Sequence, residues 1–118
     1  MNERTITVNH FESGTLSGNL VLEKMFPYPV TLDYVEAHAS NDTPATIAVA
    51  GASTMAMAAQ TIGVSGAGKI ISPTADEKAA TVGEAANSLI SITLDYDGGS
   101  GTASENVHIM AAFLVGDA

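Results

Sequence analysis

The chain has 118 residues, of which 46% are hydrophobic and 14% charged, and it contains no Cys and no Trp. Its 4 Lys and Arg stand against 13 Asp and Glu, and this net charge of −9 would repel nucleic acid and anionic membrane surfaces. No apolar run approaches the roughly 20 residues that span a bilayer, and the lack of Cys excludes a disulfide framework, a thiolate nucleophile and a zinc-thiolate site.

Length and composition predict one domain over residues 1–118 that buries about 65% of the surface of its unfolded chain. Much of the apolar content is Ala, Val and Ile, which favours a β-rich domain with small side chains. The N-terminal MNERTITVNH lacks the apolar segment of a secretory signal. We therefore expect a protein made and used in a cytoplasm, or in an assembly formed there.

Alternation of apolar and polar residues predicts β-strands in the first half of the chain. TITVNHF places Ile6 and Val8 on one face, and NLVLEKMF follows as a strand that ends at the prolines of PYP. VTLDYVEAHAS alternates until the turn SNDTP, and ATIAVAG is a further short strand. The alternation predicts one face made of Val30, Leu32, Tyr34 and Glu36, and an opposite face made of Thr31, Asp33, Val35, Ala37 and Ala39.

Two segments in the middle of the chain are ambiguous. ASTMAMAAQTIGVSG contains strong helix formers and a possible cap at Ser53, but its glycines and β-branched residues also suit a strand. As a strand it would place Met55 and Met57 on one face, either in the core or, with Met110, as a soft apolar surface for a partner. In SPTADEKAATVGEAAN, the capping-box spacing of Thr74 and Glu77 allows a helical turn or a solvated loop.

The clearest strands end the chain. SLISITLDY places four residues on one face: Ile90, Ile92, Leu94 and Tyr96. NVHIMAAFLVG does the same with Val107, Ile109, Ala111, Phe113 and Val115. The second face of this last strand is also apolar, because only His108 joins Met110, Ala112 and Leu114 there. An antiparallel strand normally wets one face, so another part of the domain or another subunit would cover it.

About eight short strands with regularly spaced turn signals predict an all-β fold. The expected architecture is an antiparallel β-sandwich, and the number of strands favours a jelly-roll-like arrangement.

The glycine-rich stretch IGVSGAGKII resembles a phosphate-binding loop, since Gly63, Gly68 and Lys69 satisfy G-x-x-x-x-G-K. The final Ser or Thr is replaced by Ile70, and Pro73 would break the helix that such a loop requires. We expect instead a turn shaped by glycines, an exposed lysine and a strand that contains both isoleucines, with no nucleotide bound.

Asp95 and Asp97 in DYDGGSG, with Glu105 nearby, superficially match the start of a calcium loop. The later ligands are missing, so the alternatives are a weak cation site and a flexible hairpin connection.

Three histidines are present, His10, His38 and His108. His38 and Glu36 share a strand face and would form a metal site only if a third ligand converged on them, the other reading being a histidine on a wet or interfacial face. No serine lies in a nucleophile-elbow pattern. We predict no catalytic residue, no cofactor, no metal site and no enzymatic activity.

The order SGTLSGNLVLEKMFPYPVTLDYVEAHASNDTPATIAV, KII and NSLISITLDYDGGSGTASENVHIMAAFLVG resembles the small β-sandwich domain of structural proteins in tailed bacteriophages. The resemblance lies in strand order and pattern over nearly the whole chain, including a closing hairpin made of the last two strands. A chain of little more than this domain is similar to capsid decoration, or cement, proteins.

The resemblance implies a structural virion protein that binds the capsid exterior, is a homotrimer, contacts the major capsid protein and strengthens the shell. The alternative is a tail-fibre or receptor-binding module that recognises a host glycan. Sugar-binding sandwiches use aromatic platforms, and this chain has only 3 Phe and 3 Tyr, which argues against the alternative.

Overall fold

The computed structural model describes residues 4–51, 56–72 and 86–115. These residues form eight β-strands and no helix. The strands are β1 (Arg4–Thr15), β2 (Leu20–Met25), β3 (Val30–His38), β4 (Thr46–Gly51), β5 (Ala56–Thr61), β6 (Lys69–Ile71), β7 (Leu89–Asp95) and β8 (Glu105–Val115).

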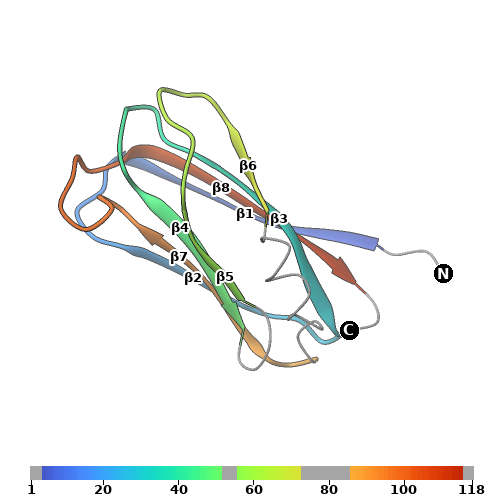
Figure 1. The fold of residues 1–118 in the computed structure, drawn as a ribbon. Helices are drawn as coiled ribbons and strands as arrows, with labels where there is room; N and C mark the ends of the chain where they lie inside the picture. Colours follow the sequence, from blue (N-terminus) through green and yellow to red (C-terminus); the bar gives the residue numbers. More distant parts are fainter. Residues whose placement is uncertain (1–3, 52–55, 73–85, 116–118) are drawn as a thin grey trace.

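The strands form two four-stranded sheets, ordered β1-β8-β3-β6 and β2-β7-β4-β5. All neighbouring strands are antiparallel. The pairs β1 with β8, β2 with β7, β3 with β6 and β4 with β5 are those of one long ribbon folded back on itself and wound into two layers, which is a jelly roll. The predicted jelly-roll-like antiparallel sandwich is confirmed, and Figure 1 shows its two layers.

The inward side chains of both sheets form one apolar core. The inward faces predicted for the last two strands are confirmed, with Tyr96 and Val115 partly buried at their ends. Ile6 and Val8 pack against the same core from β1. The inward residues of β7 and β8 that are fully or almost fully buried are Ile90, Ile92, Leu94, Val107, Ile109, Ala111 and Phe113.

The strict alternation predicted for β3 is wrong, because the strand contains a bulge. Leu32 lies opposite Phe113 and Tyr34 lies opposite Ala112, so Asp33 is an extra residue without its own partner. The bulge reverses the alternation. Val30 and Leu32 before it and Val35, Ala37 and Ala39 after it are all buried, whereas Tyr34, Glu36 and His38 face outward.

Two further sequence interpretations are settled by the strand pairing. The last two strands are not a hairpin, since β7 pairs with β2 and β4 while β8 pairs with β1 and β3. Their connection crosses from one sheet to the other because each strand has its own inward apolar face. The ambiguous segment is a strand from residue 56 onward, and Met57 lies in the core at 2% exposure. Ser53, Met55, Thr74 and Glu77 lie outside the described residues.

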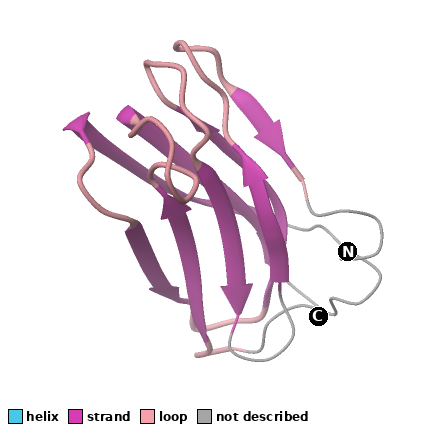
Figure 2. Ribbon diagram, turned by 60° about the vertical axis from the view of Figure 1, so that its left-hand side comes forward, coloured by secondary structure: helices cyan, strands magenta, loops and turns pink. Residues whose placement is uncertain are grey.

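Polar side chains join the strand connections at one end of the sandwich, the upper end in Figure 2. Asn41 donates from Nδ2 to the carbonyl of Ala103 at 2.9 Å and accepts at Oδ1 from the amide of Glu105 at 2.9 Å. The amide of Leu16 donates to the carbonyl of Ser104 at 3.0 Å. These bonds satisfy backbone groups that no sheet ladder reaches. The connections that gather here are 16–19, 39–45, 62–68 and 96–104.

Replacing Phe113 with Ala tests the core. The ring is fully buried and lies 5.4 Å from the ring of Phe26, centroid to centroid. We expect Phe113→Ala to lower the free energy of unfolding by about 3–5 kcal/mol, measured by urea denaturation. Phe11→Ala is the matched control, because Phe11 is 49% exposed on the opposite face of the same sheet, and its loss should be about 1 kcal/mol or less. Equal losses would contradict the assignment of the two faces.

Candidate functional site

The outward face of the β1-β8-β3-β6 sheet carries apolar, aromatic, amide and carboxylate side chains next to one another. Strand register places Asn9 opposite Met110, and Met110 opposite Glu36, which pairs with Ile70 at the sheet edge. No described strand packs over this face, because the second sheet lies against the other one. The next row along the strands is Phe11, His108 and His38.

Three rings of that row lie side by side across three strands. The ring centroids of Phe11 and His108 are 4.3 Å apart, and those of His108 and His38 are 4.8 Å apart. The two imidazoles are nearly parallel, with 13° between their planes. Cross-strand contacts of this kind stabilise a sheet and hold their side chains in place.

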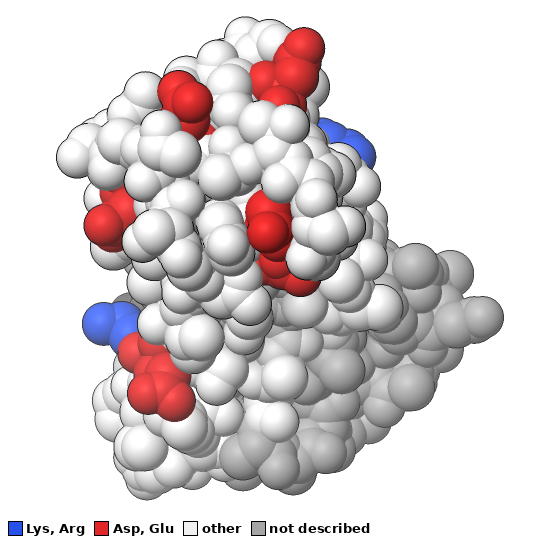
Figure 3. Space-filling model, turned by 90° about the vertical axis from the view of Figure 1, so that its left-hand side faces the viewer, with Lys and Arg blue, Asp and Glu red and all other residues white. Residues whose placement is uncertain are grey.

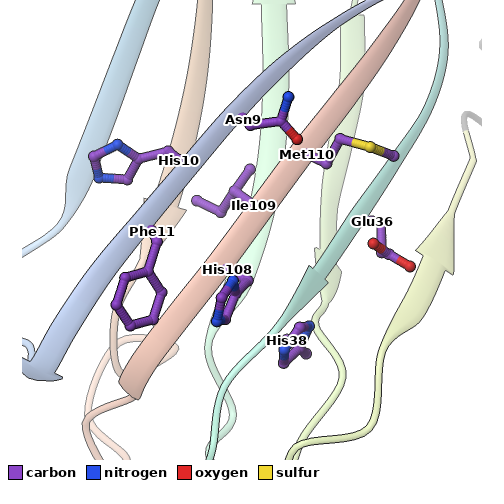
Figure 4. A pocket seen from close by; sticks show the side chains of 8 residues that line it. All are labelled: Asn9, His10, Phe11, Glu36, His38, His108, Ile109 and Met110. Carbon is purple, nitrogen blue, oxygen red and sulfur yellow. The ribbon is translucent and has the colours of Figure 1, made fainter.

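A groove of about 290 Å³ opens on this face, and we call it the outer groove. Figure 4 shows its side chains, which come from β1, β3 and β8. Its size is at the small end of the range for ligand pockets, which is about 300–1,000 Å³. The residues that line it are Asn9, His10, Phe11, Glu36, His38, His108, Ile109 and Met110.

Two polar groups in the outer groove lack partners among the described residues. The half-buried carboxylate of Glu36 makes no hydrogen bond or ion pair there. Nδ1 of His38 is buried and has no hydrogen-bond partner. The neighbouring cation of Lys69 does not pair with Glu36, because its Nζ donates to the carbonyl of Thr61 at 2.9 Å. A buried polar group without a hydrogen-bond partner lowers the stability of the fold unless a ligand or water satisfies it.

The structure brings together only some of the residues that the sequence offered for a histidine metal site. Glu36 and His38 do share a face, and His108 joins them, but its imidazole stacks on that of His38. His10 is separate, with Nε2 3.0 Å from Oε1 of Glu12. Over 4–51, 56–72 and 86–115, no group of three or more His, Cys, Asp or Glu side chains is placed to hold a metal ion.

Sequence reasoning did not single out Phe11 and connected His108 with neither His38 nor Phe11. Phe11 and His108 both occupy outward positions in strands with alternating residues. A ring at an outward position was the available sign of a candidate site. Their meeting with His38 depends on the register of β1 and β3 against β8, which joins residues about 70 to 100 positions apart.

The glycine-rich stretch is built as a turn, as predicted. β6 follows it directly, Lys69 is exposed, and Ile70 and Ile71 both lie in the strand. Its backbone amides are already engaged: Gly63 donates to Ala37, and Gly66 donates to Ala39. A phosphate-binding loop needs such amides free and a helix after them, and this segment has neither feature.

The same turn borders the outer groove. Gly63 forms a bridge with His38 at the end of β3. A side-chain carbon placed on Gly68 would lie 3.5 Å from Oε2 of Glu36 and 4.0 Å from Nδ1 of His38. The absence of a side chain at Gly68 therefore leaves Oε2 of Glu36 uncovered from this side, whereas Nδ1 of His38 is buried.

Asp95 and Asp97 shape the connection between β7 and β8. Oδ1 of Asp97 accepts from the amide of Gly99 at 2.9 Å, and Oδ1 of Asp95 lies 3.4 Å from the amide of Asp97. Glu105 does not join them in a cluster of potential metal ligands. The two carboxylates accept hydrogen bonds from turn amides, which is the usual role of Asp in such turns.

The methionines do not form the shared soft surface that was one of the predicted alternatives. Met57 lies in the core, whereas Met110 lies on the outer face of the other sheet and is half-buried. Core packing is therefore confirmed for Met57.

The acidic side chains that the structure describes do not gather into one patch on the face that Figure 3 shows. On the face shown in Figure 3, acidic side chains are scattered, and Lys and Arg occur only near its margins. Among the described residues, no helix is long and apolar enough to cross a membrane. Comparison of the chain with protein-family models, curated proteins and solved structures finds no match.

Gly63→Ala tests the packed turn. The added carbon would collide with the carbonyl oxygen of Ala67 and lie 3.2 Å from that of Ala37, neither of which is a flexible side chain. We expect the free energy of unfolding to fall by about 2 kcal/mol. In the control Gly18→Ala, where the added carbon meets nothing within 4 Å, stability should stay level or rise by up to about 1 kcal/mol. A Gly63→Ala protein as stable as the control would show that the turn is not packed as described.

Asp97→Ala separates a turn-shaping role from cation binding. Loss of the acceptor for Gly99 should lower the free energy of unfolding by about 1–2 kcal/mol, and Asp97→Asn, which keeps an oxygen at this position, should lose less. Thermal melting in millimolar calcium should match melting in a chelator for the unsubstituted protein. A calcium-dependent rise in Tm that Asp97→Ala abolishes would instead establish a cation site.

Proposed function

We propose that the protein is a structural, non-enzymatic virion component that binds the exterior of a phage capsid as a trimer and stabilises the shell. Its partner is the major capsid protein. The observation that carries this proposal is the outward face of β8, where Met110 and Leu114 are half-buried and no described strand covers them. A central strand that is apolar on both faces is suited to contact with another protein.

The exposed apolar side chains near that strand extend the proposed contact surface. Phe11 on β1 is 49% exposed and Ile70 on β6 is 58% exposed, so an exposed apolar side chain lies on each edge strand of this sheet. Thr7 and Tyr34 flank Ala112 at its centre, which is buried. The centre of this face is therefore closed by neighbouring side chains, and the half-buried Met110 and Leu114 lie on either side of it along β8.

Topology and charge are compatible with this role. Jelly rolls recur in viral capsid domains, although also in lectins, so the fold alone does not decide the function. A net charge of −9 keeps the protein from competing for packaged nucleic acid. The resemblance of the sequence to decoration proteins adds the trimer and the capsid exterior to the proposal.

A glycan-binding tail-fibre module is the second candidate, and the outer groove is the observation that favours it. The groove combines ring edges with an amide and a carboxylate, which are groups that bind sugars. Against it, the imidazoles of His108 and His38 stack on each other, so one face of each ring is covered.

Matched substitutions on the two outer faces test the proposal. We expect Ile70→Asn to weaken retention on expanded capsids about tenfold, because it removes an apolar contact at the proposed interface. Val21→Asn, at 56% exposure on the outer face of the other sheet, should leave retention unchanged. Capsid pelleting followed by quantification of bound protein gives the comparison, and melting curves verify that both variants fold.

Three outcomes would count against the proposal. Monomer alone in sedimentation, together with no retention on expanded capsids, would reject it. Loss of retention in Val21→Asn alone would place the contact on the other sheet. Specific binding on a glycan array would favour the tail-fibre candidate.

A further inference from the structure

The outer groove holds an unpaired acid beside an unpaired base. Glu36 has no partner among the described residues, and Nδ1 of His38 is buried without one. Both groups accept hydrogen bonds when the imidazole carries its proton on Nε2. Among the residues that the structure describes, no Lys or Arg lines the groove, so the Glu36 carboxylate has no cationic partner there.

The groove also offers apolar contact beside these acceptors. Phe11 and Met110 line it together with the Glu36 carboxylate, as Figure 4 shows. An aromatic ring and a thioether suit the methylene stem of a long cationic side chain, and the ring face attracts a cation. The two oxygens of the Glu36 carboxylate favour a planar guanidinium over an ammonium group, because a guanidinium holds its donors in a fixed fork and can pair with both oxygens.

We infer that the outer groove binds an arginine side chain presented by a partner protein. Its volume of about 290 Å³ suits a single long side chain better than a larger ligand. Gly68 leaves the Glu36 carboxylate open on its side, since even an added carbon there would lie 3.5 Å from Oε2. The arginine would pair with the Glu36 carboxylate, which has no partner among the described residues.

Charge indicates that the partner is a different protein. A second copy of this chain would bring 13 acidic and only 4 basic residues, of which Arg4 is the one arginine, so it is a poor source of arginine side chains. The inference rests on the proposed function to the extent that the partner is the capsid protein contacted by this sheet face. Binding of arginine itself can be measured without a capsid.

Two peptides test the inference on the full-length chain. Acetyl-Gly-Arg-Gly-amide and its neutral citrulline counterpart are titrated at low salt, and NMR follows the Met110 methyl group and the imidazoles of His38 and His108. We expect the arginine peptide to bind about tenfold more tightly, because only it places a charged donor at Glu36. Equal binding of both peptides, or no perturbation at these three residues, would overturn the inference.

A matched pair of variants separates the groove from overall charge. Glu36→Gln keeps the shape of the side chain and should weaken binding of the arginine peptide about tenfold. Glu23→Gln removes the same charge from an exposed position on β2 of the other sheet and should change binding by less than about twofold. Equal weakening in both variants would attribute binding to net charge and overturn the assignment to the groove.

The closing measurements distinguish this inference from the proposed function. Peptide binding without capsid retention would leave the arginine site standing and reject the capsid role. Capsid retention that Glu36→Gln does not weaken, together with equal binding of the two peptides, would leave the decoration role standing and reject the arginine site.

Discussion

Burial of the inward side chains of β8 holds the two sheets together. The strand lies between β1 and β3 and forms a long hydrogen-bonded ladder with each of them. Phe113 also reaches the ring of Phe26, which follows β2 of the second sheet. A strand with these connections sets the register of its neighbours, because a slip by one residue would turn every inward apolar side chain toward solvent.

The outer groove is a consequence of that register. Since side chains alternate along a strand, the ladder that buries Ile109 and Ala111 must present His108 and Met110 on the opposite face. The neighbouring strands then add Phe11 and Glu36 to the same face. The bulge at Asp33 is essential to this arrangement, because it turns Glu36 and His38 outward while Val35 and Ala37 enter the core.

The polar connections at one end of the sandwich explain residues that first suggested chemistry. The glycines before Lys69 fit a turn against the end of β3, and Asp97 accepts a bond from the turn after β7. The spacing of these residues, which resembles binding motifs, is explained by the backbone geometry of the two turns. Glu36 and Nδ1 of His38, which lack partners among the described residues, lie instead on a strand that carries no recognisable motif.

The sequence by itself determined the all-β class, the approximate strands and the inward faces of β7 and β8, because alternation is a local property that each strand carries alone. It also determined that Ile70 and Ile71 belong to a strand rather than to a phosphate-binding helix. Only the tertiary structure decided that β7 and β8 lie in different sheets, that Asp33 bulges and that residues 56–61 are extended. It alone brought Phe11, His108 and His38 into one row. These features depend on the pairing of residues far apart in the chain, and that pairing is chosen by how both sheets bury their apolar faces together.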